Sequence, residues 1–330
     1  MSLAIQEAWK NIALTYPNPS VGALILDKDG KILAIEATQP AGEAHGELKA
    51  LESALIMMGD KKIGNLKTAH EKHAYLLKHH DKQFEGAQLY VTLEPCNHQG
   101  KTPACSTLIK ALGFSKVICG IEDFNQAASG GLKTLQDAGI MIELGVMREA
   151  CKLLLTPFQR WQNNKPFIFF KLAITNNGVY DGGIITSKTS RTLVHAMRDN
   201  IDLLIIGGET VRTDRPTLDS RLVGGKAPDI LILSRQKKFD KTIPLFLVPN
   251  RKVFIEENFD KINQYRFIMI EGTQNLFIAS EDIVDWVALF RSPDMRKGET
   301  MQVSKTLKRL QQLPCGEDTL TWFEKKKDTV

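Results

Sequence analysis

The chain has 330 residues, which is too long for one comfortable core and suits two domains. Its 43% hydrophobic and 25% charged residues are typical of a globular protein, and its net charge of +5 is too small to demand a nucleic-acid partner. The sequence has no apolar run of membrane-spanning length and no basic segment followed by an apolar core at its start. We therefore expect a cytoplasmic protein, without nucleic acid or membrane as a partner, whose charge is compatible with a small phosphorylated ligand.

Strands and helices alternate along the first half, which predicts a layered α/β domain. Residues 45–58 carry apolar side chains at helical spacing and are predicted to form a helix. Other helices are predicted at residues 106–112 and 131–138. Strands are predicted at residues 20–26, 31–37, 88–93, 116–121 and 141–145.

Residues 59–85 interrupt this alternation. The segment is rich in lysine and has few large apolar residues. It also contains four histidines: His70, His73, His79 and His80. A metal site needs an organised second shell, so we expect a surface insertion with a solvated helical face rather than a metal centre.

The polar stretch at residues 162–166 ends in a proline and follows a helix predicted at residues 148–161. We place a first domain at residues 1–147 and a second at residues 148–330. In the second, a helix is predicted at residues 187–200. Strands are predicted at residues 167–174, 202–206, 229–233, 267–270 and 284–290.

One imidazole and two thiols have the chemistry of a catalytic zinc site. His45 lies two residues before Glu47, and Cys96 and Cys105 follow in a later loop and at the start of a predicted helix. Three protein ligands leave the fourth tetrahedral position open for water, whose pKa Zn²⁺ lowers. Glu47 is then placed to carry protons without binding the metal. The five cysteines are an odd number in a chain without a secretion signal, which argues against a disulfide framework.

These motifs resemble a known family. The string Pro-Cys-Asn-His-Gln-Gly-Lys-Thr-Pro-Ala-Cys at residues 95–105 resembles the zinc motif of the bifunctional deaminase–reductase of riboflavin biosynthesis, and residues 16–22 resemble its substrate loop. The resemblance implies a cytidine-deaminase-like three-layer α/β domain that hydrolyses an amino group from a diaminopyrimidinone bearing a phosphoribosylamino group. The substrate-contacting positions it implies are Asn18, His98, Lys101, Asp123 and Asn125.

The second half resembles the reductase domain of the same family, through residues 166–178 and 207–218. The resemblance implies a dihydrofolate-reductase-like α/β fold that uses NADPH to reduce the ribosyl group to a ribityl chain. The substrate positions it implies are Lys171, Arg198, Leu218, Arg221 and Glu271. The cofactor positions it implies are Ala173, Thr210, Asp214, Ser234 and Gly272.

Several positions depart from the family pattern. Asn177 stands where the family has an acid, Ile184 where it has a tryptophan, and Thr273 where it has a glycine. The alternatives are therefore a deaminase with a degenerate reductase domain, a nucleoside or tRNA zinc deaminase, and a zinc-stabilised binding protein. The sequence does not distinguish NADPH from NADH. We expect a homo-oligomer.

Overall fold

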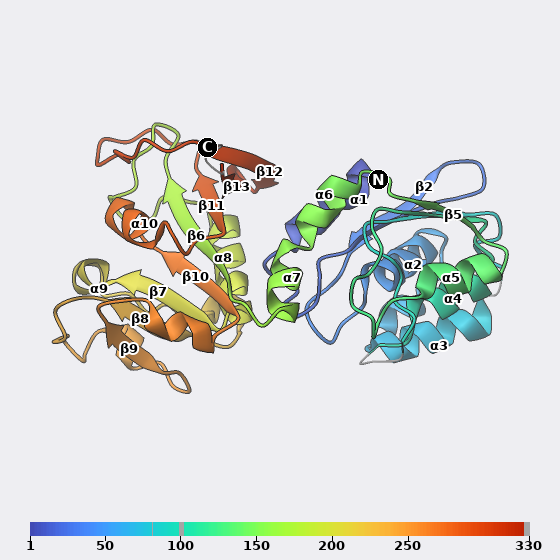
Figure 1. Cartoon of the computed structure of the whole chain (residues 1–330), viewed down its shortest axis with the longest axis horizontal. Coiled ribbons are helices and arrows are strands. Elements are labelled where there is room, and N and C mark those ends of the chain that lie inside the picture. The colour runs from blue at the N-terminus through green and yellow to red at the C-terminus, as the bar shows by residue number, and fades with distance from the viewer. Residues whose placement is uncertain (81, 99–101, 327–330) are drawn as a thin grey trace. The chain divides into compact units, whose positions relative to one another are not determined.

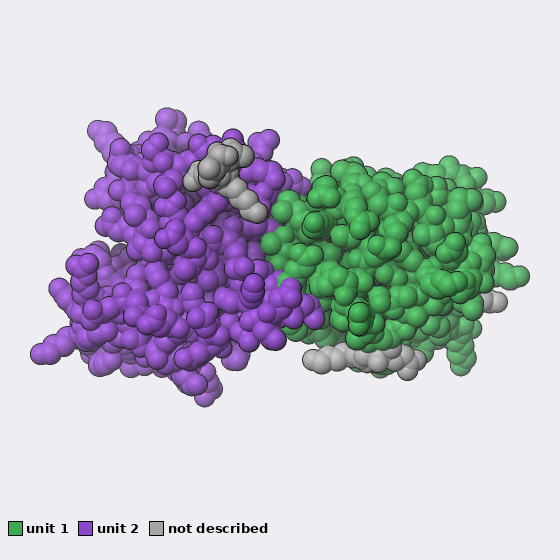
Figure 2. Space-filling view, in the orientation of Figure 1, with its two compact units in different colours: residues 1–159 green, residues 160–330 purple. Residues whose placement is uncertain are grey.

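The computed structural model describes residues 1–80, 82–98 and 102–326. The chain forms two compact units, residues 1–159 and residues 160–330, which are coloured separately in Figure 2. The helix expected at residues 148–161 is divided into α6 (Arg148–Leu154) and α7 (Thr156–Gln162). Pro157 accounts for the break, because proline cannot donate the intrahelical hydrogen bond and is tolerated only in a helix's first turn. The boundary between the units falls within α7.

The first unit contains a five-stranded sheet with the strand order β2-β1-β3-β4-β5. β1 is antiparallel to both β2 and β3, whereas β3, β4 and β5 are parallel. These strands are β1 (Gly22–Leu26), β2 (Ile32–Ala37), β3 (Gln88–Val91), β4 (Lys116–Cys119) and β5 (Met141–Leu144). Each lies within a predicted strand. The parallel strands end at one edge, where the loops after β3 and β4 emerge.

Helices cover both faces of this sheet and give three layers (Figure 1). On one face, α1 packs against β1, β2 and α6, and on the other α2 packs against β1 and β2. Gly22 allows the close approach of α1, because a Cβ there would collide with the backbone of Ala4. The helices of this unit not yet given are α1 (Ser2–Lys10), α2 (Gly46–Met57), α3 (Ala69–His79), α4 (Cys105–Ala111) and α5 (Gly131–Asp137).

Residues 59–85 form the short 3-10 helix η1 (Ile63–Asn65) and helix α3, which contacts α2 and α4. Thr68 and Glu71 cap α3 reciprocally, as a capping box. The segment is not wholly solvated, because Ile63 and Leu76 are fully buried. His73 is also buried, which differs from the solvated face expected for the four histidines.

The second unit contains an eight-stranded sheet with the order β12-β13-β11-β6-β10-β7-β8-β9. The strands from β11 to β9 are parallel, and the hairpin of β12 and β13 adds two antiparallel strands at the β11 edge. The strands are β6 (Phe167–Ile174), β7 (Leu203–Gly207), β8 (Asp229–Leu233), β9 (Val253–Glu256), β10 (Phe267–Glu271), β11 (Trp286–Arg291), β12 (Leu307–Cys315) and β13 (Asp318–Lys325).

Long apolar runs identify the central strands of this sheet. The residues of β10 are all buried, as expected for a parallel strand covered on both faces. The helices are α8 (Lys188–Asn200), α9 (Gly208–Asp214) and α10 (Gln274–Ser280), with 3-10 helices at η2 (Arg221–Val223), η3 (Pro244–Phe246) and η4 (Asp260–Gln264). Among the described residues, no helix combines the length and hydrophobicity needed to cross a bilayer.

Candidate functional site

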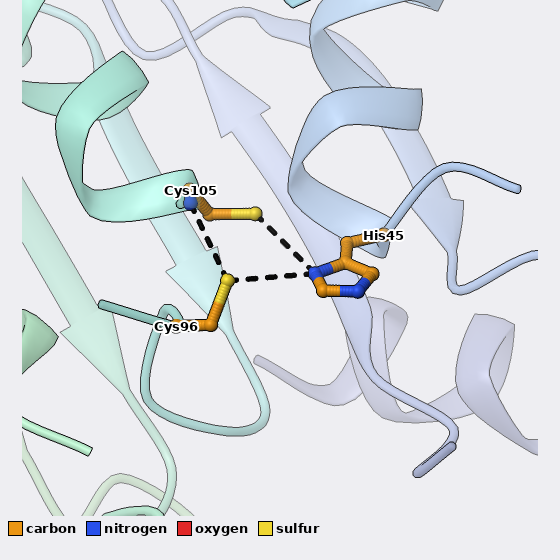
Figure 3. A group of neighbouring side chains, drawn as sticks. All are labelled: His45, Cys96 and Cys105. Carbon is orange, nitrogen blue, oxygen red and sulfur yellow. Dashed lines mark hydrogen bonds between the residues drawn. The ribbon is translucent and has the colours of Figure 1, made fainter. Parts of the chain in front are cut away.

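His45, Cys96 and Cys105 converge at the carboxyl edge of the first unit's sheet (Figure 3). His45 is the N-cap of α2, Cys105 is the first residue of α4, and Cys96 lies in the loop after β3. The Sγ atoms of Cys96 and Cys105 lie 3.5 Å and 3.6 Å from Nδ1 of His45. Among the described residues, these three form the single cluster of possible metal ligands.

The spacing of these atoms matches a tetrahedral zinc site. Zn–N bonds of about 2.0–2.1 Å and Zn–S bonds of about 2.3 Å separate nitrogen from sulfur by about 3.5–3.6 Å. Both measured nitrogen–sulfur distances have this value. The donor set, one imidazole and two thiols, is also one that zinc prefers, so the residues present fit the metal that the sequence implies.

Two neighbours fix the orientation of His45. A Cβ on Gly46 would lie 2.5 Å from the carbonyl oxygen of Val21, so glycine is needed for the start of α2 to approach β1 this closely. On the other side, Nε2 of the ring lies 3.0 Å from the buried hydroxyl of Thr102. Outer hydrogen bonds of this kind orient metal-binding histidines. The sequence analysis assigned no role to Thr102, although the residue lies within the motif.

The two thiols differ in acidity. The hydrogen bond from the Cys105 thiol lowers the pKa of Cys96 to about 4, and His45 lowers it further against the effect of burial. The same hydrogen bond, with burial and the charge of Glu47, raises the pKa of Cys105 well above its usual range. Zinc binding requires both sulfurs as thiolates, so metal uptake releases a proton.

Glu47 lies in the first turn of α2 and is 4% exposed. Burial raises its pKa to about 7, and the charge of Cys96 adds to the effect. The carboxyl group is within hydrogen-bonding reach of Cys105, so it borders the metal position without being one of the clustered ligands. A carboxyl group that exchanges protons near neutral pH suits general acid–base catalysis.

Glu94 connects the metal loop to the loop after β4. Its buried carboxylate accepts hydrogen bonds from the backbone N–H groups of Asp123, Gly130 and Leu132. Asp123 accepts a hydrogen bond from the N–H of Asn125. Burial and the charges of Glu94 and Cys96 raise the pKa of Asp123. The predicted substrate position Asp123 therefore lies in the electrostatic field of the metal site. The sequence analysis missed the role of Glu94, which lies two residues before a ligand.

The other predicted substrate residues of this unit lie in loops. Asn18 is partly buried in the loop between α1 and β1, and its N–H donates to the carbonyl oxygen of Thr15. His98 is exposed in the loop after Cys96. Lys101 lies outside the described residues. The roles of these residues stay predictions.

Lys171, Arg198 and Glu271 form a buried charge cluster in the second unit. Lys171 and Glu271 are paired in register on β6 and β10, and Arg198 lies near the end of α8. The guanidinium of Arg198 donates to both carboxylate oxygens of Glu271, at 2.7 Å and 2.9 Å, and Nζ of Lys171 lies 3.6 Å from one of them. Burial raises the pKa of Glu271, but the two cations outweigh burial and lower it to about 2. Burial lowers the pKa of Lys171, and Glu271 offsets only part of this effect.

Asp219 extends this cluster toward the remaining predicted substrate positions. Its carbonyl oxygen accepts from Arg198 at 3.3 Å, and its carboxylate pairs with Arg221 at 2.6 Å. Leu218 is buried beside it, with a left-handed backbone (φ 54°). Nδ1 of His195 lies 3.9 Å from the Asp219 carboxylate. The structure thus brings together all five predicted substrate residues of this unit, and Asp219 and His195 are neighbours that the sequence did not indicate.

The predicted cofactor positions also share one edge of the sheet, the carboxyl edge. Ala173 lies on β6, and Gly272 follows β10 directly. Thr210 and Asp214 lie on α9, which follows β7, and Ser234 follows β8. The hydroxyl of Ser234 accepts a hydrogen bond from Arg212. Ligands of open parallel sheets bind outside the carboxyl ends of the strands, so this placement is compatible with a dinucleotide.

The amide at position 177, where the family has an acid, has a structural explanation. Nδ2 of Asn177 donates to the carbonyl oxygen of Arg296 at 2.7 Å, and Oδ1 accepts from the N–H of the same residue at 3.1 Å. A carboxylate cannot make the first of these bonds. Asn177 therefore joins the turn after β6 to the loop after β11. Ile184, in place of the usual tryptophan, is exposed.

Comparison with known families agrees with this two-unit arrangement. Residues 1–121 match the family described as "Cytidine and deoxycytidylate deaminase zinc-binding region", and residues 167–311 match "RibD C-terminal domain". The chain is thus of the class that joins a cytidine-deaminase-like α/β unit to a reductase-type α/β unit, and the predicted fold class is confirmed.

Individual relatives identify the family. Riboflavin biosynthesis protein RibD of Synechocystis is 37% identical over 231 residues, which cover 68% of this chain and 55% of that protein. RibD of Aquifex aeolicus is 33% identical over 71% of this chain and 60% of that protein, so the matched region spans less than two thirds of both relatives. A Thermotoga maritima structure, described as a diaminohydroxyphosphoribosylaminopyrimidine deaminase/5-amino-6-(5-phosphoribosylamino)uracil reductase, is 27% identical with a TM-score of 0.64, covering 99% of this chain and 97% of that one. The chain belongs to the RibD family of riboflavin-biosynthesis proteins.

Proposed function

We propose that this chain catalyses two consecutive reactions of riboflavin biosynthesis. The first is the hydrolytic deamination of 2,5-diamino-6-(5-phosphoribosylamino)pyrimidin-4(3H)-one in the N-terminal unit. The second is the NADPH-dependent reduction of the ribosyl group to a ribityl group in the C-terminal unit. The observation that carries the proposal is the zinc-like spacing of 3.5 Å and 3.6 Å between Nδ1 of His45 and the two sulfurs, beside the buried Glu47.

In the deamination, Glu47 is the proton carrier. A zinc ion held by His45, Cys96 and Cys105 lowers the pKa of the water at its open position. The carboxylate of Glu47 accepts a proton from the attacking water, then delivers it to the ring nitrogen and the departing amine, which leaves as ammonia. Its burial keeps bulk water away from this transfer. Substrate contacts are assigned by family resemblance to the following residues: Asn18, His98, Lys101, Asp123 and Asn125.

In the reduction, NADPH supplies the hydride and the protein supplies orientation. Lys171 is the residue we assign to the sugar, because its ammonium is held beside Glu271 at the carboxyl edge of the sheet and can polarise the carbonyl of the opened ribose. The hydroxyls of Thr210 and Ser234 suit polar contacts to the dinucleotide. Arg198 keeps the Glu271 carboxylate in place.

The test is to incubate the zinc-loaded full chain with the diaminopyrimidinone phosphate, with and without NADPH, and to identify the products by mass. Without NADPH we expect ammonia and the amino-to-oxo product, and with NADPH we expect the same product carrying two more hydrogens. Absence of ammonia release from a fully zinc-loaded protein would refute the first reaction. If ammonia is released but neither NADPH nor NADH is oxidised, the chain is a deaminase alone.

A pair of lysine variants localises the second reaction. Lys171→Ala should abolish substrate-dependent NADPH oxidation while ammonia release continues, because the two sites are separate. Lys165→Ala is the matched control, since this exposed lysine lies just before the same strand. Full NADPH oxidation by Lys171→Ala would contradict the role assigned to Lys171.

A further inference from the structure

The ring of His73 contacts the backbone beside the proposed metal site. His73 lies on α3 and is 7% exposed, and its Nε2 is 3.3 Å from the carbonyl oxygen of Ala104. A carbonyl oxygen only accepts hydrogen bonds, so this contact requires the proton on Nε2. Ala104 directly precedes Cys105.

The peptide bond that His73 contacts also contacts a metal ligand. The carbonyl of Ala104 and the N–H of Cys105 belong to one planar amide. That N–H donates to Sγ of Cys96 at 3.4 Å. The order of contacts is therefore the imidazole N–H of His73, the amide between Ala104 and Cys105, and the sulfur of Cys96.

Other contacts hold α3 in place for this role. Lys72, the neighbour of His73, forms a 2.9 Å ion pair with Glu52, which is 4% exposed on α2. Leu76, on the same side of α3 as His73, is fully buried. Consecutive residues of α3 thus contact α2, which begins just after His45, and the N-cap of α4, which begins with Cys105.

We propose that His73 is a positioning residue for the zinc site, acting on the Cys96 thiolate through the amide between Ala104 and Cys105. A hydrogen bond to the carbonyl oxygen polarises the amide and makes its N–H a better donor. A stronger N–H bond to sulfur stabilises the thiolate against protonation. It also holds Cys96 and Cys105 at the separation that the metal requires. The proposal rests on the proposed zinc function.

The experiment measures zinc affinity in the full-length protein by competition with a chromogenic chelator. The key variants are His73→Met and His73→Gln, which have nearly the same shape and differ in that only glutamine can donate to the Ala104 carbonyl. We expect His73→Met to raise the zinc dissociation constant about 10-fold or more, as outer-shell changes do, and His73→Gln to recover most of the affinity. His70→Met is the matched control, because His70 is exposed on the same helix; it should bind zinc like the wild type.

Cobalt substitution gives a readout that packing alone does not move. Loss of an N–H bond to sulfur raises the energy of the sulfur electrons, so the thiolate-to-cobalt absorption band of His73→Met should move to lower energy, and that of His73→Gln should not. Zinc binding by His73→Met within twofold of the wild type would overturn the proposal. Equal behaviour of His73→Met and His73→Gln would also overturn it, because shape alone would then explain the effect.

A measurement on the wild-type protein covers the case in which both variants fail to fold. Long-range proton–nitrogen correlation spectra of the histidine rings report which nitrogen carries the proton, and we expect His73 to be protonated at Nε2 alone. Protonation at Nδ1, or a mixture of the two forms, would overturn the proposal. Wild-type protein that binds no zinc would instead refute the proposed function, so the two failures are distinguishable.

Discussion

Replacing Glu271 by glutamine should strongly destabilise the second unit. The substitution keeps the shape of the side chain but removes the negative charge that faces Arg198 and Lys171. Glu271 is 9% exposed, so solvent screens little of this interaction. Two like charges would be left buried next to each other, and breaking a buried ion pair from one side costs about 3–5 kcal/mol.

The pKa of Glu271 gives a second route to this magnitude. Its value falls from the ordinary 4.5 to about 2 on folding. Each pKa unit is worth about 1.4 kcal/mol, so the carboxylate contributes about 3 kcal/mol to the free energy of unfolding at neutral pH. Because the pKa is lowered in the folded protein, this contribution is present above pH 4.5 and is lost as the pH falls from there to about 2. The variant should lack this acid-dependent step.

The assay is urea unfolding followed by tryptophan fluorescence, since Trp286 and Trp322 contact each other in the core of the second unit. Hydrogen exchange of the β10 amides assigns the change to this unit, and zinc content serves as the control for the first unit. Adding Lys171→Met to Glu271→Gln should restore part of the stability, because it removes one of the two unpaired cations. A Glu271→Gln protein destabilised by less than about 1 kcal/mol, or a double variant weaker than the single one, would refute the reasoning.

The first unit supports three further predictions. Glu47→Gln should keep zinc but lower ammonia release about 100-fold or more, because an amide cannot carry the proton; near-normal release at full zinc occupancy would refute its role. Cys105→Ser should lose zinc and activity together, as a hydroxyl is a poor zinc ligand at neutral pH, and atomic absorption would detect retained metal if the ligand set is incorrect. Thr102→Val should weaken zinc binding about 10-fold by freeing Nε2 of His45, with unchanged unfolding of the metal-free protein; unaltered affinity would argue against this contact.

Local sequence patterns predicted the elements that carry the first site. The apolar spacing of residues 45–58 predicted α2 (Gly46–Met57) within a residue at each end, and the apolar runs predicted strands β3 and β4. The spacing of His45, Cys96 and Cys105 indicated the ligand set because their chemical types are rare in combination. Such patterns reveal which residues are special and which element they begin.

Contacts between distant segments were not predictable in the same way. The capping box of Thr68 and Glu71 was readable in the sequence, yet the polar composition of α3 suggested a solvated face. The contact of His73 with Ala104, 31 residues away, depends on how α3 packs. The same holds for Asp219, whose two arginine partners come from α8 and η2. Polar residues that act through tertiary contacts leave no periodic signal.

The two sites differ in the charge that each lacks. In the first, metal binding brings together two thiolates and the Glu47 carboxylate, and such a concentration of negative charge is stable only beside a cation. In the second, Lys171 and Arg198 face the single carboxylate of Glu271, while Arg221 and Asp219 neutralise each other. That site keeps one uncompensated positive charge at the carboxyl edge of the sheet. Charges left unbalanced within the protein are matched by what binds, so the first site suits a divalent metal and the second an anionic substrate, as one phosphorylated pyrimidine processed in turn requires.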